Sequence, residues 1–236
     1  MKNKNLTFST YDCFTKVRFG GNVGVIVWNA HSLNNDEMQK IAKEFNAPVT
    51  GFITKQGIST VTARFFMPTA EIAMCGHVTI GIFSHLSKKQ KERIKNYKLN
   101  IPTGKISVNV QLNDNDLPTV MFSSQLPKYK KIDININNLL HELKINKNDT
   151  FLQSKTHIFD AGLKHIFINI KDSETLKSLS PNFEELTNLC KKNNIHTVAC
   201  FSINKYKKNH IIIRDFCPLL GVKETAASGT TNAALT

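Results

Sequence analysis

Two glycine-centred segments, far apart in the chain, have the residue types of an anion-binding site. Cys75-Gly76-His77 follows an expected strand and opens an expected helix, and Ser228-Gly229-Thr230 does the same near the other end of the chain. Glycine allows a ligand to approach the backbone closely, and the unpaired N–H groups at a helix start favour an anion such as a carboxylate. The two segments therefore predict one carboxylate-binding cleft, with a segment on each wall.

A third candidate group is the carboxylate of Glu44, in the last turn of a helix predicted over residues 34–45. The apolar residues that recur there at helical spacing are Met38, Ile41, Ala42 and Phe45. A carboxylate beside a low-dielectric cleft has its pKa raised toward neutrality, so that it takes a proton from carbon and returns it elsewhere without a cofactor. Without further context, a glutamate in such a turn is a solvated surface group.

The elements that would position these residues occur in a similar order in both halves of the chain. In the first half, strands are expected at 11–15, 22–28, 51–54 and 60–67, a helix over about 77–95, and further strands at 98–101, 105–112 and 118–124. In the second half, strands are expected at 157–162, 164–170, 197–203 and 209–216, with a helix around 182–192. The Lys-, Asn- and Ile-rich segment 127–148 reads as a weakly structured crossover between the halves.

Composition and charge exclude several classes of protein. The chain has 236 residues, 41% hydrophobic and 21% charged, which is typical of a folded globular protein. It contains neither a membrane-length apolar run nor the apolar core of a signal peptide, so we expect a cytoplasmic protein. The net charge of +13 lies in short lysine runs without a nucleic-acid-binding motif, which favours a solvated basic surface. Five scattered cysteines predict reduced thiols rather than disulfides or a zinc site.

Against this background the chain resembles the PhzF-like isomerases of phenazine biosynthesis. The resemblance rests on three linked motifs, namely 11–15 with Gly21-Asn22, 41–46 with 50–52, and 75–81. It continues through 160–162 and 214–218 with Gly221 and Glu224, and so covers essentially the whole chain. It implies an α+β, diaminopimelate-epimerase-like fold of two similar halves, each with a sheet wrapped around a central helix.

The resemblance also assigns roles to particular residues. Glu44 matches the family's acid/base, and His77 matches a histidine that polarises or hydrogen-bonds the substrate. Gly76, Gly229 and Thr230 match positions that bind substrate, with Ser228 and Thr225 beside them. Taken alone, His77 would bond local backbone at a helix start and the glycines would be simple caps.

The chain departs from the family pattern at two points. Thr225 stands where the family commonly has an active-site aspartate, and a threonine carries no charge, so the specific phenazine-pathway reaction is not expected. The segment 74–77 also looks like the first cysteine motif of the two-cysteine racemases and epimerases, but Ser228 replaces their second cysteine. Cys75 is thus either an alternative catalytic thiol or a small buried residue at a helix start.

We therefore expect half-domains at 1–125 and 126–236, the second truncated at its central helix because the chain stops at Thr236. The favoured function is a cofactor-independent isomerase, without a metal, that acts on a small carboxylated metabolite. The alternatives are an amino-acid or hydroxy-acid racemase or epimerase using Cys75, and an inactive family member that acts as a binding protein. We expect no nucleic-acid or membrane partner, and a homodimer is left open.

Overall fold

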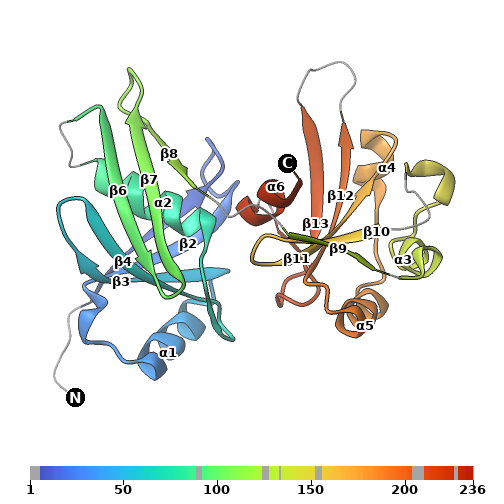
Figure 1. Ribbon diagram of the computed structural model, residues 1–236, viewed down its shortest axis with the longest axis horizontal. Helices are drawn as coiled ribbons and strands as arrows, with labels where there is room; N and C mark the ends of the chain where they lie inside the picture. Colours follow the sequence, from blue (N-terminus) through green and yellow to red (C-terminus); the bar gives the residue numbers. More distant parts are fainter. Residues whose placement is uncertain are drawn as a thin grey trace. The chain divides into compact units, whose positions relative to one another are not determined.

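The chain folds into two compact units, residues 1–124 and 125–236, and each unit combines one sheet with helices (Figure 1). The structure, a computed structural model, describes residues 6–88, 92–123, 128–132, 134–151, 156–203, 210–225 and 228–235. Both sheets mix parallel and antiparallel strand pairs. The predicted α+β class is confirmed.

Unit 1 contains an eight-stranded sheet in the order β1-β2-β3-β4-β6-β7-β8, with β5 paired to β4. Its strands are β1 (Thr7–Cys13), β2 (Asn22–Trp28), β3 (Val49–Gln56), β4 (Thr60–Phe66), β5 (Glu71–Ile72), β6 (Ile94–Ile101), β7 (Gly104–Leu112) and β8 (Pro118–Phe122). The sheet curls around α2 (Gly76–Ser87), since this helix contacts β1–β3 at one end of the strand order and β7 and β8 at the other (Figure 1). At the start of α2, His77 is buried next to Gly24 of β2, whereas Gly76 is partly exposed.

A second helix, α1 (Asn35–Phe45), covers the other face of the same sheet. Its first turn is fixed by a capping box, because Asn34 Oδ1 accepts from the Glu37 N–H and Glu37 Oε2 accepts from the Asn34 N–H. Met38 and Ala42 are buried against the sheet. The helix ends at Phe45, and its C-cap Asn46 has a left-handed conformation (φ 48°). This helix, predicted over 34–45, is confirmed, and it places Glu44 in its last turn.

Unit 2 contains a six-stranded sheet in the order β14-β13-β12-β11-β10-β9. Its strands are β9 (Lys128–Ile132), β10 (Thr156–Asp160), β11 (Lys164–Asn169), β12 (Thr197–Ile203), β13 (Ile211–Phe216) and β14 (Glu224–Thr225). Its helices are α3 (Ile136–Glu142), α4 (Ser173–Ser178), α5 (Phe183–Asn193) and α6 (Gly229–Leu235). Its core joins the sheet to α3, α4 and α5, while α6 packs against β11.

Two sequence-based expectations need correction. The helix expected to reach residue 95 ends at Ser87, and Ile94 already belongs to β6; residues 89–91 lie outside the described part of the chain. The segment 127–148 is not weakly structured, because it carries β9, α3 and a short 3-10 helix (Lys147–Asp149). The buried Leu139 and Leu140 anchor α3 to the unit 2 core.

Three further observations concern membrane-spanning helices, metal ligands and disulfides. Among the described helices, none has the length and apolar character that crossing a bilayer requires. No group of three or more histidine, cysteine or acidic side chains in the described ranges is arranged to ligate a metal ion. All five cysteines are buried and none forms a disulfide.

Candidate active site

The first wall of the predicted site is the start of α2, where His77 is buried with 8% of its surface exposed. Its ring Nδ1 lies 3.2 Å from the Cys75 Sγ, and its backbone carbonyl accepts a hydrogen bond from the Cys13 Sγ at 2.9 Å. The ring also hydrogen-bonds the backbone of Val23 on β2. Two thiols and one strand therefore hold His77 in place.

Burial sets the protonation of this cluster. It lowers the pKa of His77 to about 4, although the hydrogen bond to Val23 opposes the shift, and it raises the pKa of Cys75 to about 12. Burial also raises the pKa of Cys13 to about 11. At neutral pH burial therefore favours a neutral imidazole and two protonated thiols in this cluster.

Two glycines let α2 approach the sheet closely enough to bury His77. A Cβ at Gly24 would lie 2.9 Å from Val78 Cγ2 and 3.2 Å from His77 Cδ2, and a Cβ at Gly51 would lie 2.6 Å from Val78 Cγ1. Both approaches are closer than side-chain carbons tolerate. Val78, one residue after His77, therefore occupies a hollow formed by two adjacent strands.

Glu44, the predicted acid/base, is exposed in the last turn of α1. Its helix-mates Met38 and Ala42 face the core, whereas Glu44 lies on the solvent side of the same helix. The two predicted catalytic groups of unit 1 thus differ in environment, because His77 is enclosed by protein and Glu44 is open to solvent.

An arginine–glutamate pair fixes the segment that leads into α2. Arg64 Nε and Nη2 donate to the two oxygens of Glu71 at 2.8 and 2.6 Å, and Nη1 donates to Asn35 Oδ1 at 2.7 Å. Paired N–H···O bonds to one carboxylate are geometrically specific. The pair ties β4 and β5 to the first residue of α1, and so connects the helix of Glu44 to the segment before His77.

Unit 2 repeats this arrangement. Arg214 Nε and Nη2 donate to the two oxygens of Glu224 at 3.0 and 2.8 Å, and Nη1 donates to the Leu179 carbonyl oxygen, just after α4, at 2.6 Å. Neither arginine–glutamate pair was predicted from the sequence. The signal was present as Arg-x-Phe-x-Pro at 64–68 and again at 214–218, each followed by a glutamate five residues before the helix-start glycine.

The second predicted wall is the start of α6. The Ser228 hydroxyl accepts from the Thr231 N–H at 3.2 Å and lies 2.9 Å from the Thr230 hydroxyl, while Gly229 is the first helical residue. Thr225, also partly buried, ends β14 and pairs with Asp215. Ser228, Gly229 and Thr230 are thus adjacent at one helix start, whereas the shared cleft with α2 stays a prediction.

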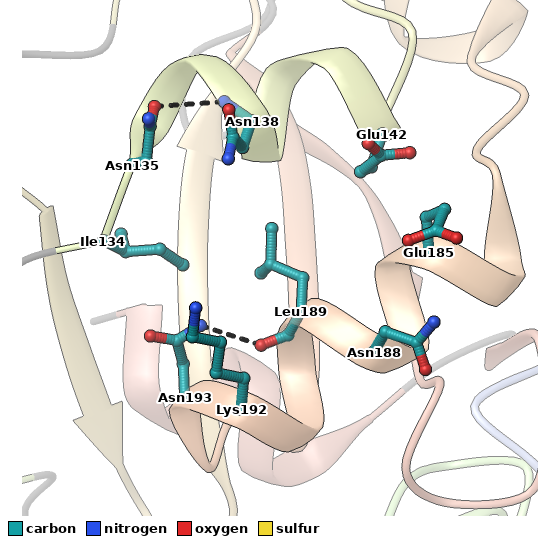
Figure 2. A pocket seen from close by; sticks show the side chains of 9 residues that line it. All are labelled: Ile134, Asn135, Asn138, Glu142, Glu185, Asn188, Leu189, Lys192 and Asn193. Carbon is teal, nitrogen blue, oxygen red and sulfur yellow. Dashed lines mark hydrogen bonds between the residues drawn. The ribbon is translucent and has the colours of Figure 1, made fainter.

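A pocket of about 450 Å³ lies elsewhere, between α3 and α5 of unit 2 (Figure 2). Glu142 and Glu185 lie on the same side of its opening, and Lys192 lies farther along α5. None of the predicted site residues lines it. Because Glu185 and Lys192 are exposed, the pocket is a surface groove rather than an enclosed site.

Solved structures define the class of fold. A phenazine biosynthesis protein of the PhzF family from Bacillus anthracis superposes with a TM-score of 0.85 at 21% identity, covering 98% of this chain and 79% of that one. A hydroxyproline epimerase from Agrobacterium vitis superposes with a TM-score of 0.63 at 12% identity, covering 100% and 77%. The fold is that of the diaminopimelate-epimerase-like and proline-racemase-like proteins, as predicted.

Sequence comparison defines the family. Residues 11–236 match the family described as phenazine biosynthesis-like protein (PhzC-PhzF). An uncharacterized isomerase of Clostridium acetobutylicum is 31% identical over 230 residues, 95% of this chain and 76% of the relative. A trans-2,3-dihydro-3-hydroxyanthranilate isomerase of Pseudomonas chlororaphis is 25% identical over 224 residues, 93% of this chain and 74% of the relative. The chain belongs to the PhzC-PhzF family.

Proposed function

We propose that the chain is a cofactor-independent isomerase that moves a proton within a small carboxylated substrate. The observation that carries the proposal is the buried, neutral imidazole of His77 at the start of α2, in a chain that matches the isomerase family from residue 11 to 236. In this proposal the single N–H of the neutral imidazole leaves the Val23 backbone and donates to a substrate oxygen, which adds no charge to the site.

Glu44 is the proposed acid/base. Its carboxylate removes a proton from a substrate carbon, the electron pair shifts along the substrate, and the same group returns the proton to another carbon, so the substrate is neither oxidised nor reduced. In this proposal the bound substrate covers the exposed Glu44 carboxylate when it acts. The covering substrate would exclude water from the proton transfer.

The remaining predicted residues bind the substrate. The backbone N–H groups at Gly76 and Gly229 and the hydroxyls of Ser228 and Thr230 offer hydrogen-bond donors to a carboxylate. Thr225 supplies a hydroxyl where the family commonly has an aspartate. The preferred substrate therefore differs from the one named for the Pseudomonas chlororaphis isomerase.

A racemase that uses Cys75 is the second candidate, because the epimerase from Agrobacterium vitis shares the fold. The pKa of Cys75, raised by burial to about 12, argues against it, since the thiolate is the reactive form. Ser228 at the second cysteine position also argues against a racemase, because a hydroxyl without an activating base does not replace a thiolate.

The test is solvent-deuterium uptake by a panel of carboxylates, followed by NMR. The panel contains trans-2,3-dihydro-3-hydroxyanthranilate, other cyclic β,γ-unsaturated carboxylates, trans-4-hydroxy-L-proline and both enantiomers of proline. We expect an unsaturated member other than trans-2,3-dihydro-3-hydroxyanthranilate to gain deuterium at a new position with its original stereocentre unchanged. Deuterium at an inverted stereocentre would establish a racemase instead. Thermal stabilisation by a carboxylate without any exchange would establish a binding protein, and either result refutes the proposal.

A further inference from the structure

The starts of α2 and α6 rest on equivalent strand positions. In unit 1, Phe65 pairs with Gly51 and Gly24 pairs with Val49. In unit 2, Asp215 pairs with Ala199 and His165 pairs with Thr197. When the two arginine–glutamate pairs are aligned, Phe65 corresponds to Asp215, Gly24 to His165, Val49 to Thr197 and Val78 to Thr231.

The helix start packs on these strand positions through an apolar contact in unit 1 and through a polar contact in unit 2. In unit 1 the contact is apolar, since Val78 lies over two glycines next to the ring of Phe65. In unit 2 it is polar, because the Thr231 hydroxyl donates to Asp215 Oδ2 at 2.5 Å and His165 Nδ1 lies 2.6 Å from the Thr197 hydroxyl.

The polar cluster is fully enclosed. His165, Thr197, Asp215 and Thr231 are exposed by 0%, 1%, 4% and 1%. Within the described residues, His165 Nε2 and Asp215 Oδ1 have no hydrogen-bond partner. Burial raises the pKa of Asp215 to about 6, although hydrogen bonds from the Thr231 and Thr197 side chains oppose the shift. Enclosing these groups costs stability that the apolar contact of unit 1 does not cost.

The polar contact, unlike the apolar one, fixes the orientation of the helix start. Val78 is held only by the shape of its hollow, whereas the Thr231 hydroxyl must point at one oxygen of Asp215. Thr231 also donates its N–H to the Ser228 hydroxyl, which contacts the Thr230 hydroxyl. A rotation of the first turn of α6 would therefore break the bond to Asp215 and move both neighbouring hydroxyls.

We propose that Asp215 is a positioning residue, which through Thr231 fixes the hydroxyls of Ser228 and Thr230 and the backbone of Gly229 in their binding orientation. The proposal rests on the proposed function, because that function makes these groups the substrate-binding wall. Asp215 itself does not touch the substrate.

The test uses three variants of the full chain. Thr231→Val keeps the shape of the side chain and removes its hydroxyl, while Thr231→Ser keeps the hydroxyl. Thr187→Val is the matched control, because the Thr187 hydroxyl donates to the Phe183 carbonyl oxygen within its own helix, α5. The first measurement needs no ligand: it is amide hydrogen exchange of the peptide covering α6. We expect Thr231→Val to speed exchange about tenfold, which is the effect of losing one hydrogen bond of about 1.4 kcal/mol. Exchange in Thr231→Ser and in Thr187→Val should stay within about threefold of wild type.

The second measurement separates positioning from mere stability. With the panel carboxylate that wild type turns over fastest, Thr231→Val should raise KM about tenfold and change kcat by less than about threefold, well below the melting temperature. Thr231→Ser should restore KM. A lowered melting temperature with unchanged KM, or exchange in Thr231→Val equal to that of wild type, would overturn the proposal. If wild type turns over no member of the panel, the proposed function fails, and the exchange measurement alone decides the role of Asp215.

Discussion

The close approach of α2 to its sheet predicts that a single methyl group at Gly51 will disturb the start of α2, the first wall of the proposed site. A Cβ there would lie 2.6 Å from Val78 Cγ1, about 1 Å inside ordinary carbon–carbon contact. The start of α2 must then move outward or Val78 must adopt a poor rotamer. Overpacking of this kind costs about 1–3 kcal/mol, so Gly51→Ala should lower the free energy of unfolding by that amount and Tm by roughly 3–10 °C.

Urea unfolding of a double-mutant cycle measures the effect. Gly51→Ala and Val78→Ala are made singly and together, since loss of the Val78 methyl groups removes the clash. We expect the double variant to be more stable than the sum of the single effects by about 1–2 kcal/mol. Gly57→Ala is the control, because its Cβ would meet only the Thr60 carbonyl oxygen, at 3.6 Å. Strict additivity in the cycle, or an equal loss in the control, would refute the reasoning.

Three further predictions concern buried and paired groups. Burial raises the pKa of Asp215 from 3.8 to about 6, so folding favours the protonated carboxyl. The resulting stabilisation of the folded state is about 3 kcal/mol. It is fully present below pH 3.8 and is lost as the pH rises through 6. The free energy of unfolding in urea should therefore rise for Asp215→Asn relative to wild type between pH 4 and pH 7.5. A difference between the two proteins that does not change with pH would contradict the raised pKa. Cys75→Ala should change the turnover rate by less than about tenfold, and loss of all activity would favour the thiol mechanism. Arg214→Lys, which keeps the charge but loses the paired bonds to Glu224, should cost about 1 kcal/mol of unfolding free energy, with no change expected if the charge alone matters.

Local patterns in the sequence predict much of the fold. The helix of Glu44 follows from its apolar spacing and from Asn34, whose capping box with Glu37 the structure contains. Most strands follow from alternation or from apolar runs between turns. The helix start at Gly76 was also predicted within one residue, because a glycine after a strand marks such a boundary.

Other features depend on contacts that a local pattern does not reveal. Strand β9 was missed because it lies at the sheet edge and exposes Tyr129 and its lysines, so it has no apolar face. The second helix was predicted too long because lysine-rich sequence after Leu86 favours a helix without anchoring one. The cluster of His165 and Asp215 was missed because its members come from separate strands, and only the register brings them together.

The central claim is that Glu44 transfers the proton, and the most direct test is the rate of solvent-deuterium uptake by Glu44→Gln. The change keeps the shape of the side chain but removes its ability to exchange a proton, so uptake should fall by about 10²–10⁴-fold while fold and ligand binding are retained. Glu184→Gln, at another exposed helix position, is the matched control and should behave as wild type. Deuterium uptake by Glu44→Gln at the rate of wild type would contradict the account.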